Sequence, residues 1–115
     1  MDYGNSVELL PAGTVITAGA NGEVVLDTIN KSTLRAVVDV SAVSGTSTPT
    51  ITFTVQTSAD KGVTDSWRDV AAFSGITATG KSRKAFPGLD RYTRIKWAVT
   101  GTTPSFTLGV TGEVV

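Results

Sequence analysis

The stretch VSGTSTPTITFTVQT (residues 43–57) contains the features that decide the fold. In its second half every other residue is apolar, and these positions are Ile51, Phe53 and Val55. A two-residue period is typical of a β-strand with one face buried and the other in water. In its first half Gly45 is a turn former, and Pro49 stands at the start of the strand, where its missing N–H is tolerated. The stretch therefore predicts a turn followed by a strand of an antiparallel sheet.

The remaining patterns predict an all-β fold. The stretch VTGTTPSFTLGV (residues 99–110) repeats the order of strand, Gly-Thr turn, proline and strand, so we expect two similar hairpins at one end of a sandwich. Residues 34–42 and 91–100 alternate in the same way, and Asn21-Gly22 is typical of a type I′ hairpin turn. Threonine and valine favour strands. We predict an antiparallel β-sandwich or jelly roll of about seven or eight short strands.

A chain of 115 residues has the size of one domain. Proline and glycine interrupt residues 1–22, which predicts an N-terminal arm or edge strands that order against a neighbour. Residues 23–115 are expected to form the sandwich domain. The start of the chain lacks a basic segment followed by an apolar one, and no apolar run is long enough to span a membrane, so we expect a protein made in the cytoplasm with no membrane partner.

The composition argues against an enzyme. The chain contains no cysteine and no histidine, which removes disulfides, thiolate zinc sites and the usual general base. No carboxylate pair, Ser-x-x-Lys motif or phosphate-binding loop is evident, so we expect no catalytic residues, no cofactor and no metal. The loop SADKGVTDSW (residues 58–67) has two aspartates, but Lys61 between them disfavours calcium. We interpret this loop as a connection between strands in which Trp67 packs into the core.

Charge is segregated along the chain although the net charge is zero. Residues 1–80 contain four basic and eight acidic groups, and residues 81–115 contain six basic and two acidic groups. If residues 81–86 and 91–99 form neighbouring strands, one partner-binding surface collects Lys81, Arg83, Lys84, Arg91, Tyr92, Arg94 and Lys96. The alternative is an ordinary solvated face. Because no pair of stacking aromatics interleaves these charges, nucleic acid is not expected. Trp97 alternates with the core positions, and Tyr92, on the wet face, leaves glycan binding open.

The segments TVITAGANGEVVLDT, VVDVSAVSGTSTPTITFTVQTSADKGVTDSWRDVAAFSGIT and ATGKSRKAFPGLDRYTRIKWAVTGTTPSFTLGV carry a family resemblance. Their order of GT-P turns, QTS-D loop, tryptophan, F-G--RY-R and GT-PSFT resembles small structural proteins of tailed bacteriophages, some of which coat the capsid as decoration (cement) proteins. The resemblance covers about residues 14–112. It implies a β-sandwich located in the virion, assembled in the host cytoplasm and bound to the major capsid protein or other virion proteins. It also implies a homo-oligomer, for which we expect a trimer. A neck or tail component and a carbohydrate-binding module for host attachment remain alternatives.

Overall fold

The computed structural model describes residues 6–22 and 24–115. Within these ranges the chain forms seven strands, which are β1 (Ser6–Ile16), β2 (Ala20–Asn21), β3 (Leu26–Asp27), β4 (Thr33–Ser58), β5 (Arg68–Ala72), β6 (Gly80–Pro87) and β7 (Tyr92–Val114). All strand pairs are antiparallel. The described part of the chain contains no helix long and apolar enough to cross a membrane.

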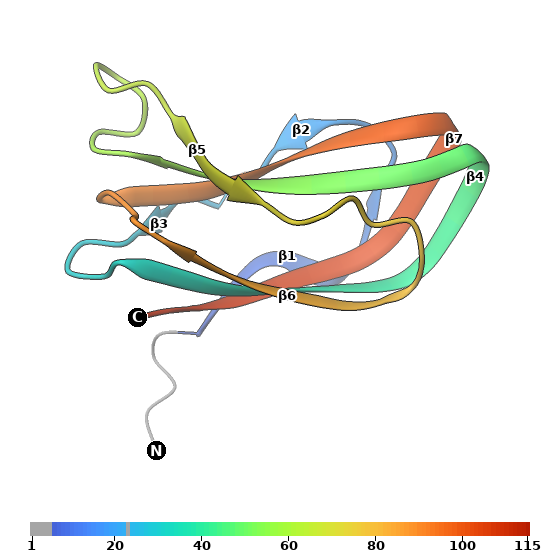
Figure 1. The fold of residues 1–115 in the computed structure, drawn as a ribbon, viewed down its shortest axis with the longest axis horizontal. Helices are drawn as coiled ribbons and strands as arrows, with labels where there is room; N and C mark the ends of the chain where they lie inside the picture. The colour runs from blue at the N-terminus through green and yellow to red at the C-terminus, as the bar shows by residue number, and fades with distance from the viewer. Residues whose placement is uncertain (1–5, 23) are drawn as a thin grey trace.

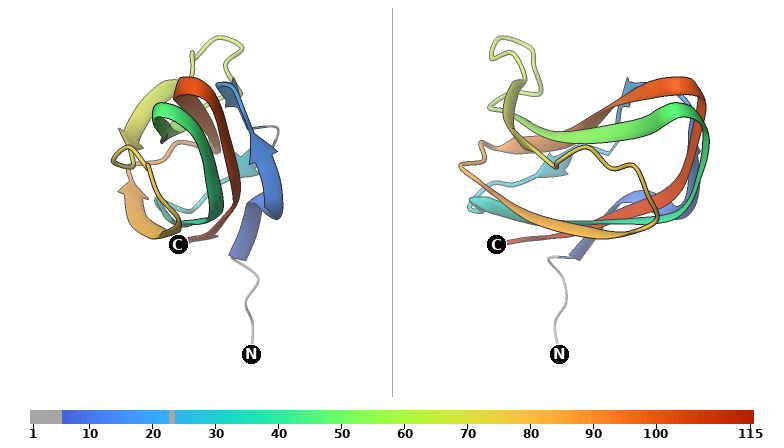
Figure 2. Two further views of the ribbon diagram at one scale, coloured as in Figure 1. Left: turned by 90° about the vertical axis from the view of Figure 1, so that its right-hand side faces the viewer. Right: turned by 45° about the vertical axis from the view of Figure 1, so that its right-hand side comes forward.

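Two long strands organise the molecule. β4 and β7 pair with each other from Leu34↔Val114 to Ser58↔Tyr92, and both bend in the middle (Figure 1). Before the bend β4 lies in a lower sheet of order β1-β7-β4-β6, and after it β4 lies in an upper sheet in which β5, β4 and β7 are followed by the short β2 and β3. Figure 2 shows both strands turning the corner side by side.

The connections between the sheets wrap the sandwich. β1 and β6 are the two edges of the lower sheet, and each is joined along the chain to an edge of the upper sheet, β1 to β2 and β6 to β5. This arrangement is a β-sandwich in which one long antiparallel pair, β4 and β7, contributes to both layers. The expected fold class, an all-β antiparallel sandwich, is confirmed.

The prediction of two hairpins at the Gly-Thr-Pro stretches is wrong. Both stretches are corners at which one continuous strand passes from the lower sheet to the upper sheet, and they pair with each other across register shifts. Gly45 and Gly101 have φ values of 119° and 113°, which favour glycine. A Cβ atom on Gly45 would lie 2.9 Å from the carbonyl oxygen of Thr103, and one on Gly101 would lie 2.9 Å from Cα of Pro49. Glycine and proline residues of this kind are compatible with a hairpin turn or with a corner in a continuous strand. Which of the two forms depends on the strand, distant in sequence, that pairs with the stretch.

The prediction of a hairpin at Asn21-Gly22 is also wrong. β2 and β3 both pair antiparallel with β7, so they run in the same direction and cannot be the two arms of a hairpin. Gly22 has no positive φ and instead donates its N–H to the carbonyl oxygen of Ile95 at 2.7 Å. A Cβ atom there would lie 3.1 Å from Cγ1 of Ile95, so glycine allows a close approach of the two segments.

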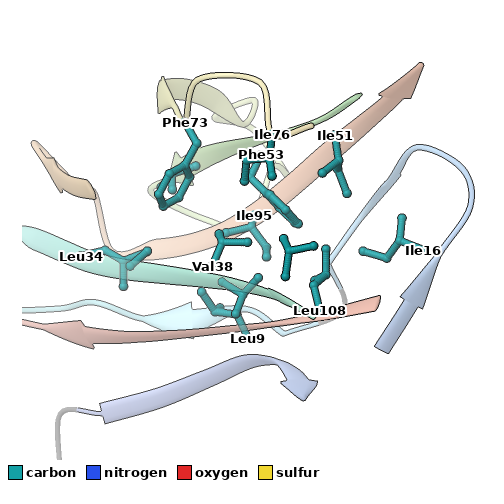
Figure 3. Close-up of a cluster of buried hydrophobic side chains, with 14 of the residues drawn as sticks. Leu9, Ile16, Leu34, Val38, Ile51, Phe53, Phe73, Ile76, Ile95 and Leu108 are labelled. Carbon is teal, nitrogen blue, oxygen red and sulfur yellow. The ribbon is translucent and has the colours of Figure 1, made fainter. Parts of the chain in front are cut away.

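The core fills the space between the two sheets (Figure 3). It consists of inward strand positions together with Phe73 and Ile76, which follow β5, and its members are Leu9, Ile16, Leu34, Ala36, Val38, Val40, Ile51, Phe53, Val55, Phe73, Ile76, Phe86, Ile95, Phe106, Leu108, Val110 and Val114. Leu9 and Ile16 lie on β1, so residues 6–16 contribute to the same core as the rest of the sandwich. Trp97 is partly buried and packs on this core, with its ring centroid 5.9 Å from that of Phe53. Residues 1–5 of the expected arm lie outside the described residues.

Candidate partner-binding surfaces

The basic residues that the sequence analysis grouped together lie in different places. β6 pairs with β4 and belongs to the lower sheet, whereas the first half of β7 belongs to the upper sheet. Lys81 and Arg83 therefore lie on the outer face of the lower sheet, and Arg94 and Lys96 lie on the outer face of the upper sheet. The expected single cluster does not form, because the connection after Pro87 crosses from one sheet to the other instead of making a hairpin.

The three other members lie at the margins of the sandwich. Lys84 donates a hydrogen bond from Nζ to the carbonyl oxygen of Ala72 at 2.8 Å, which ties β6 to β5 across the open side of the sandwich. Arg91 is exposed just before β7 and forms an ion pair with Asp27 at 3.6 Å. The guanidinium carbon of Arg91 also lies 5.1 Å from the ring centroid of Tyr92. Arg91 and Tyr92 are thus neighbours, as expected, but Lys84 is not near them.

Neighbouring strands supply hydrogen-bond and ion-pair partners for Arg94 and Lys96 on the outer face of the upper sheet. Gln56 accepts a hydrogen bond from Nε of Arg94 at 3.0 Å and donates one to a carboxylate oxygen of Asp69 at 2.9 Å. The ammonium of Lys96 lies 3.3 Å from the same oxygen. The hydrogen bond from Gln56, followed by that from Lys96 and its charge, lowers the pKa of Asp69. The sheet thus places an acidic partner beside Lys96, on β5, within the same chain.

Trp67 is not a core residue, contrary to the sequence interpretation. It is half-buried on the outer side of the upper sheet, where the guanidinium carbon of Arg94 lies 4.4 Å from its ring centroid. A Cβ atom on Gly62 would lie 2.7 Å from Cδ1 of Trp67, so the indole covers the loop. Trp67 comes before the first residue of β5, where no alternation fixes the direction of a side chain. Its partners are therefore a guanidinium and a glycine instead of the core.

The two aspartates of the 58–67 loop hold the loop itself. Asp60 accepts hydrogen bonds from the N–H groups of Val63, Thr64 and Asp65 at 3.1, 2.9 and 3.1 Å and from the hydroxyl of Thr64. These bonds, above all the one from the Thr64 hydroxyl, lower the pKa of Asp60 to about 2. Ser58 donates to the carbonyl oxygen of Asp65 at 2.6 Å. Among the described residues no group of three or more acidic side chains is placed to hold a metal ion.

The connections 28–32, 59–67 and 88–91 lie together at the end of the sandwich opposite the corners (Figure 1). We call this region the loop end. Buried hydroxyls join its connections: Thr28 donates to the carbonyl oxygen of Asp90 at 2.6 Å, and Thr57 accepts from the N–H of Asp90 at 2.7 Å. Arg68 donates to the carbonyl oxygen of Gly88 at 2.7 Å. These bonds tie the 88–91 connection to the 28–32 connection and to Thr57 and Arg68, on the strands that flank the 59–67 loop, and no buried polar side-chain atom in the described ranges lacks a hydrogen-bond partner.

The loop end presents apolar side chains to solvent. Val63 is 81% exposed at the tip of the 59–67 loop, and Ile29 is 51% exposed on the 28–32 connection. Tyr92, the first residue of β7, pairs with Asp27 and Ser58, which precede these two connections, and the ammonium of Lys61 lies 4.9 Å from its ring centroid. The sequence analysis did not identify Val63 or Ile29. The signal was present, because a single branched apolar residue in the polar loop DKGVTDS has no neighbour with which to form a core.

Comparisons with known proteins give little more. No family model matches the chain, and no curated protein matches it. Among solved structures, the chain is similar to one described as a crystal structure of PirA. The two share 15% sequence identity with a TM-score of 0.48, and the match covers 100% of this chain and 95% of the other. This similarity carries no information about function.

Proposed function

We propose that this protein is a structural component of a tailed-bacteriophage virion, and that it decorates the capsid by binding the head surface through its loop end. The proposal takes the virion role from the resemblance in sequence, and the capsid or another virion protein is its partner. The observation that carries the choice of the loop end is Val63, an apolar side chain that is 81% exposed on a loop held by the hydrogen bonds to Asp60.

An exposed apolar side chain on a rigid loop suits a binding role. Association costs free energy when loops and side chains must be ordered, and a loop that is already fixed avoids much of that cost. Burial of Val63 and Ile29 against a partner removes apolar surface from water, which favours binding. Lys61 and Arg91 lie against Tyr92 at the rim of this surface, but Arg91 is paired with Asp27, and Asp60 and Asp65 stand in the same loop as Lys61, so apolar burial is the term that favours binding here.

The test is co-sedimentation with purified phage heads. We expect the Val63→Asp variant to bind heads at least about tenfold more weakly, because a charge replaces the apolar tip. The matched control is Val15→Asp, since Val15 is 60% exposed on β1, away from the loop end. Circular dichroism checks that both variants keep the sheet. If Val63→Asp binds as the parent does, the loop end is not the docking surface, and if the parent binds no virion component, the decoration role is wrong.

A carbohydrate-binding role is the second candidate, and one observation favours it. Trp67, expected in the core, lies at the surface on the same sheet face as Tyr92, so this face carries two aromatic rings instead of one. Sugars stack on such rings, but Arg94 covers the indole and Lys61 and Arg91 lie against the phenol ring. A glycan array separates the roles: specific binding that Tyr92→Ala abolishes would support host attachment. Electron microscopy of the virion would separate the head from the neck and tail.

A further inference from the structure

The outer face of the lower sheet has a charge pattern that the functional proposal does not use. We call it the lower face and define it by the outward residues Glu8, Thr111, Glu113, Arg35, Val37, Asp39, Lys81 and Arg83. Across the sheet, the side formed by β1 and β7 carries Glu8 and Glu113, whereas the far edge, β6, carries Lys81 and Arg83. The β1/β7 side of the face is therefore acidic, and the β4/β6 side has a basic excess, with Arg35, Lys81 and Arg83 against Asp39, which pairs with Lys81 in the strand register.

Around Val37 the lower face carries small side chains and shallow depressions. Three shallow, open depressions lie on it, and Val37 lines all three. Next to them β1 lies over the outward position Gly109, which is buried, and a Cβ atom on Gly109 would lie 2.9 Å from Cα of Ala12. Val37 and Thr111 are thus the small residues at the middle of the face, and Arg35, Asp39 and Glu113 lie on the same two central strands.

The strand register places these residues in rows. Glu8 pairs with Thr111, Thr111 with Val37, and Val37 with Arg83, so these four residues form one row across the sheet. The next outward row contains Glu113 paired with Arg35, whose side chains lie 4.0 Å apart. In both rows the acidic residue is on the β1/β7 side and the basic residue is on the β4/β6 side.

We propose that a second copy of this chain packs on the lower face, about a two-fold axis that runs parallel to the strands between β4 and β7. Such an axis keeps each row at its own level and exchanges the two sides of the sheet. It places Glu8 opposite Arg83 of the second copy, Glu113 opposite Arg35, and Val37 opposite Thr111. A two-fold axis perpendicular to the strands would instead place β6 against β6, and like charges would meet, which is unfavourable.

The size of the face indicates a modest affinity. Four strands about 4.8 Å apart, each contributing about eight residues at about 3.3 Å, span roughly 19 by 26 Å. That gives about 500 Å² per copy, below the roughly 800 Å² of a standard stable interface, so the dimer is expected to be a weak one whose dissociation can be measured. Aligned packing of two sheets in this way is a common geometry. Because the axis is parallel to the strands, both loop ends point in the same direction in the dimer.

The test measures the oligomeric state of the full chain by sedimentation equilibrium at low and high salt. We expect dimers at low salt, and we expect Glu8→Arg and Arg83→Glu each to weaken dimerisation by about tenfold or more, because each reversal places like charges opposite one another twice. An equimolar mixture of the two variants should dimerise about as well as the parent, because both Glu–Arg contacts are then restored. Lys61→Glu, at the loop end, is the control and should dimerise as the parent does.

Three outcomes would overturn the inference. A chain that stays monomeric up to about 0.5 mM at low salt has no usable self-association surface. A trimer, the state expected from the resemblance, cannot be built on this two-fold axis. Loss of head binding in Glu8→Arg together with a monomeric parent would assign the lower face to the capsid protein. The inference does not rest on the virion role, because a dimer that follows the charge reversals stands whether or not phage heads are bound.

Discussion

Replacing Gly45 with alanine tests the corner directly. At φ 119° an L-residue is strained by about 1–3 kcal/mol. The new Cβ atom would also lie 2.9 Å from the carbonyl oxygen of Thr103 and 3.0 Å from Cα of Pro104, both of them backbone atoms that cannot rotate away. Overpacking of this kind typically adds about 1–3 kcal/mol. We expect Gly45→Ala to lower the free energy of unfolding by about 4 kcal/mol in total, measured by urea denaturation.

Gly80→Ala is the matched control. Gly80 has a φ of 133°, similar to that of Gly45, but nothing lies within 4 Å of the position its Cβ would occupy. It should therefore show the backbone strain alone, about 1–3 kcal/mol. The difference between the two variants measures the contact between the two corners. If Gly45→Ala costs no more than Gly80→Ala, the corners do not pack as described and the reasoning fails.

Three further predictions concern the upper sheet and its loop. Trp67→Ala should cost about 1–2 kcal/mol of stability in thermal or urea unfolding, because only packing on the loop and stacking with Arg94 are lost. Phe106→Ala in the core should cost about 3–5 kcal/mol. Equal costs would mean that Trp67 packs in the core after all. The pKa of Asp60 is lowered to about 2, so the contribution of its carboxylate to loop order should be complete above its unfolded pKa near 3.8 and should be lost as the pH falls toward 2. Hydrogen exchange of the loop amides should show this step in the parent and not in Asp60→Asn. Addition of calcium or EDTA should leave the Tm of the parent unchanged. The double variant Arg94→Glu, Lys96→Glu should keep the strand signal in circular dichroism, but its free energy of unfolding should fall by about 1–2 kcal/mol and its Tm should fall with it, since a carboxylate would then face Asp69. An unchanged Tm would mean that the network with Gln56 contributes nothing to stability.

The direction of most side chains in the alternating stretches could be predicted from the sequence, although Ala42, expected on the buried face, is exposed near the corner. Ile51, Phe53 and Val55 are buried as their alternation indicates, while Thr52 and Thr54 between them remain partly exposed. This succeeds because the two-residue period is a local property of an extended backbone, and one apolar face suffices to set it. The all-β class follows from many such segments.

The pairing of strands could not be predicted in the same way. The sequence interpretation placed Lys81 and Arg83 beside Arg94, because neighbours along the chain often pair. In the structure β6 pairs with β4 about 45 residues earlier, as in Val38↔Ser82, and this choice depends on how the whole core closes. The prediction that Trp67 is buried in the core failed because Trp67 lies outside any alternating segment. The partner-binding role of the basic residues remains a prediction.

The continuous β4 and β7 strands have a consequence for how the chain folds. Because both sheets are built from the same two strands, neither sheet can form or melt while the other persists, so we expect one cooperative unfolding transition. The pairing partners are separated by 34 residues at Ser58↔Tyr92 and by 80 residues at Leu34↔Val114. Closing such long loops before the contacts form is slow, and folding in milliseconds to seconds is typical of this topology. A slip of register in one sheet would be carried through the corner into the other, where the contacts of Gly45 and Gly101 would oppose it.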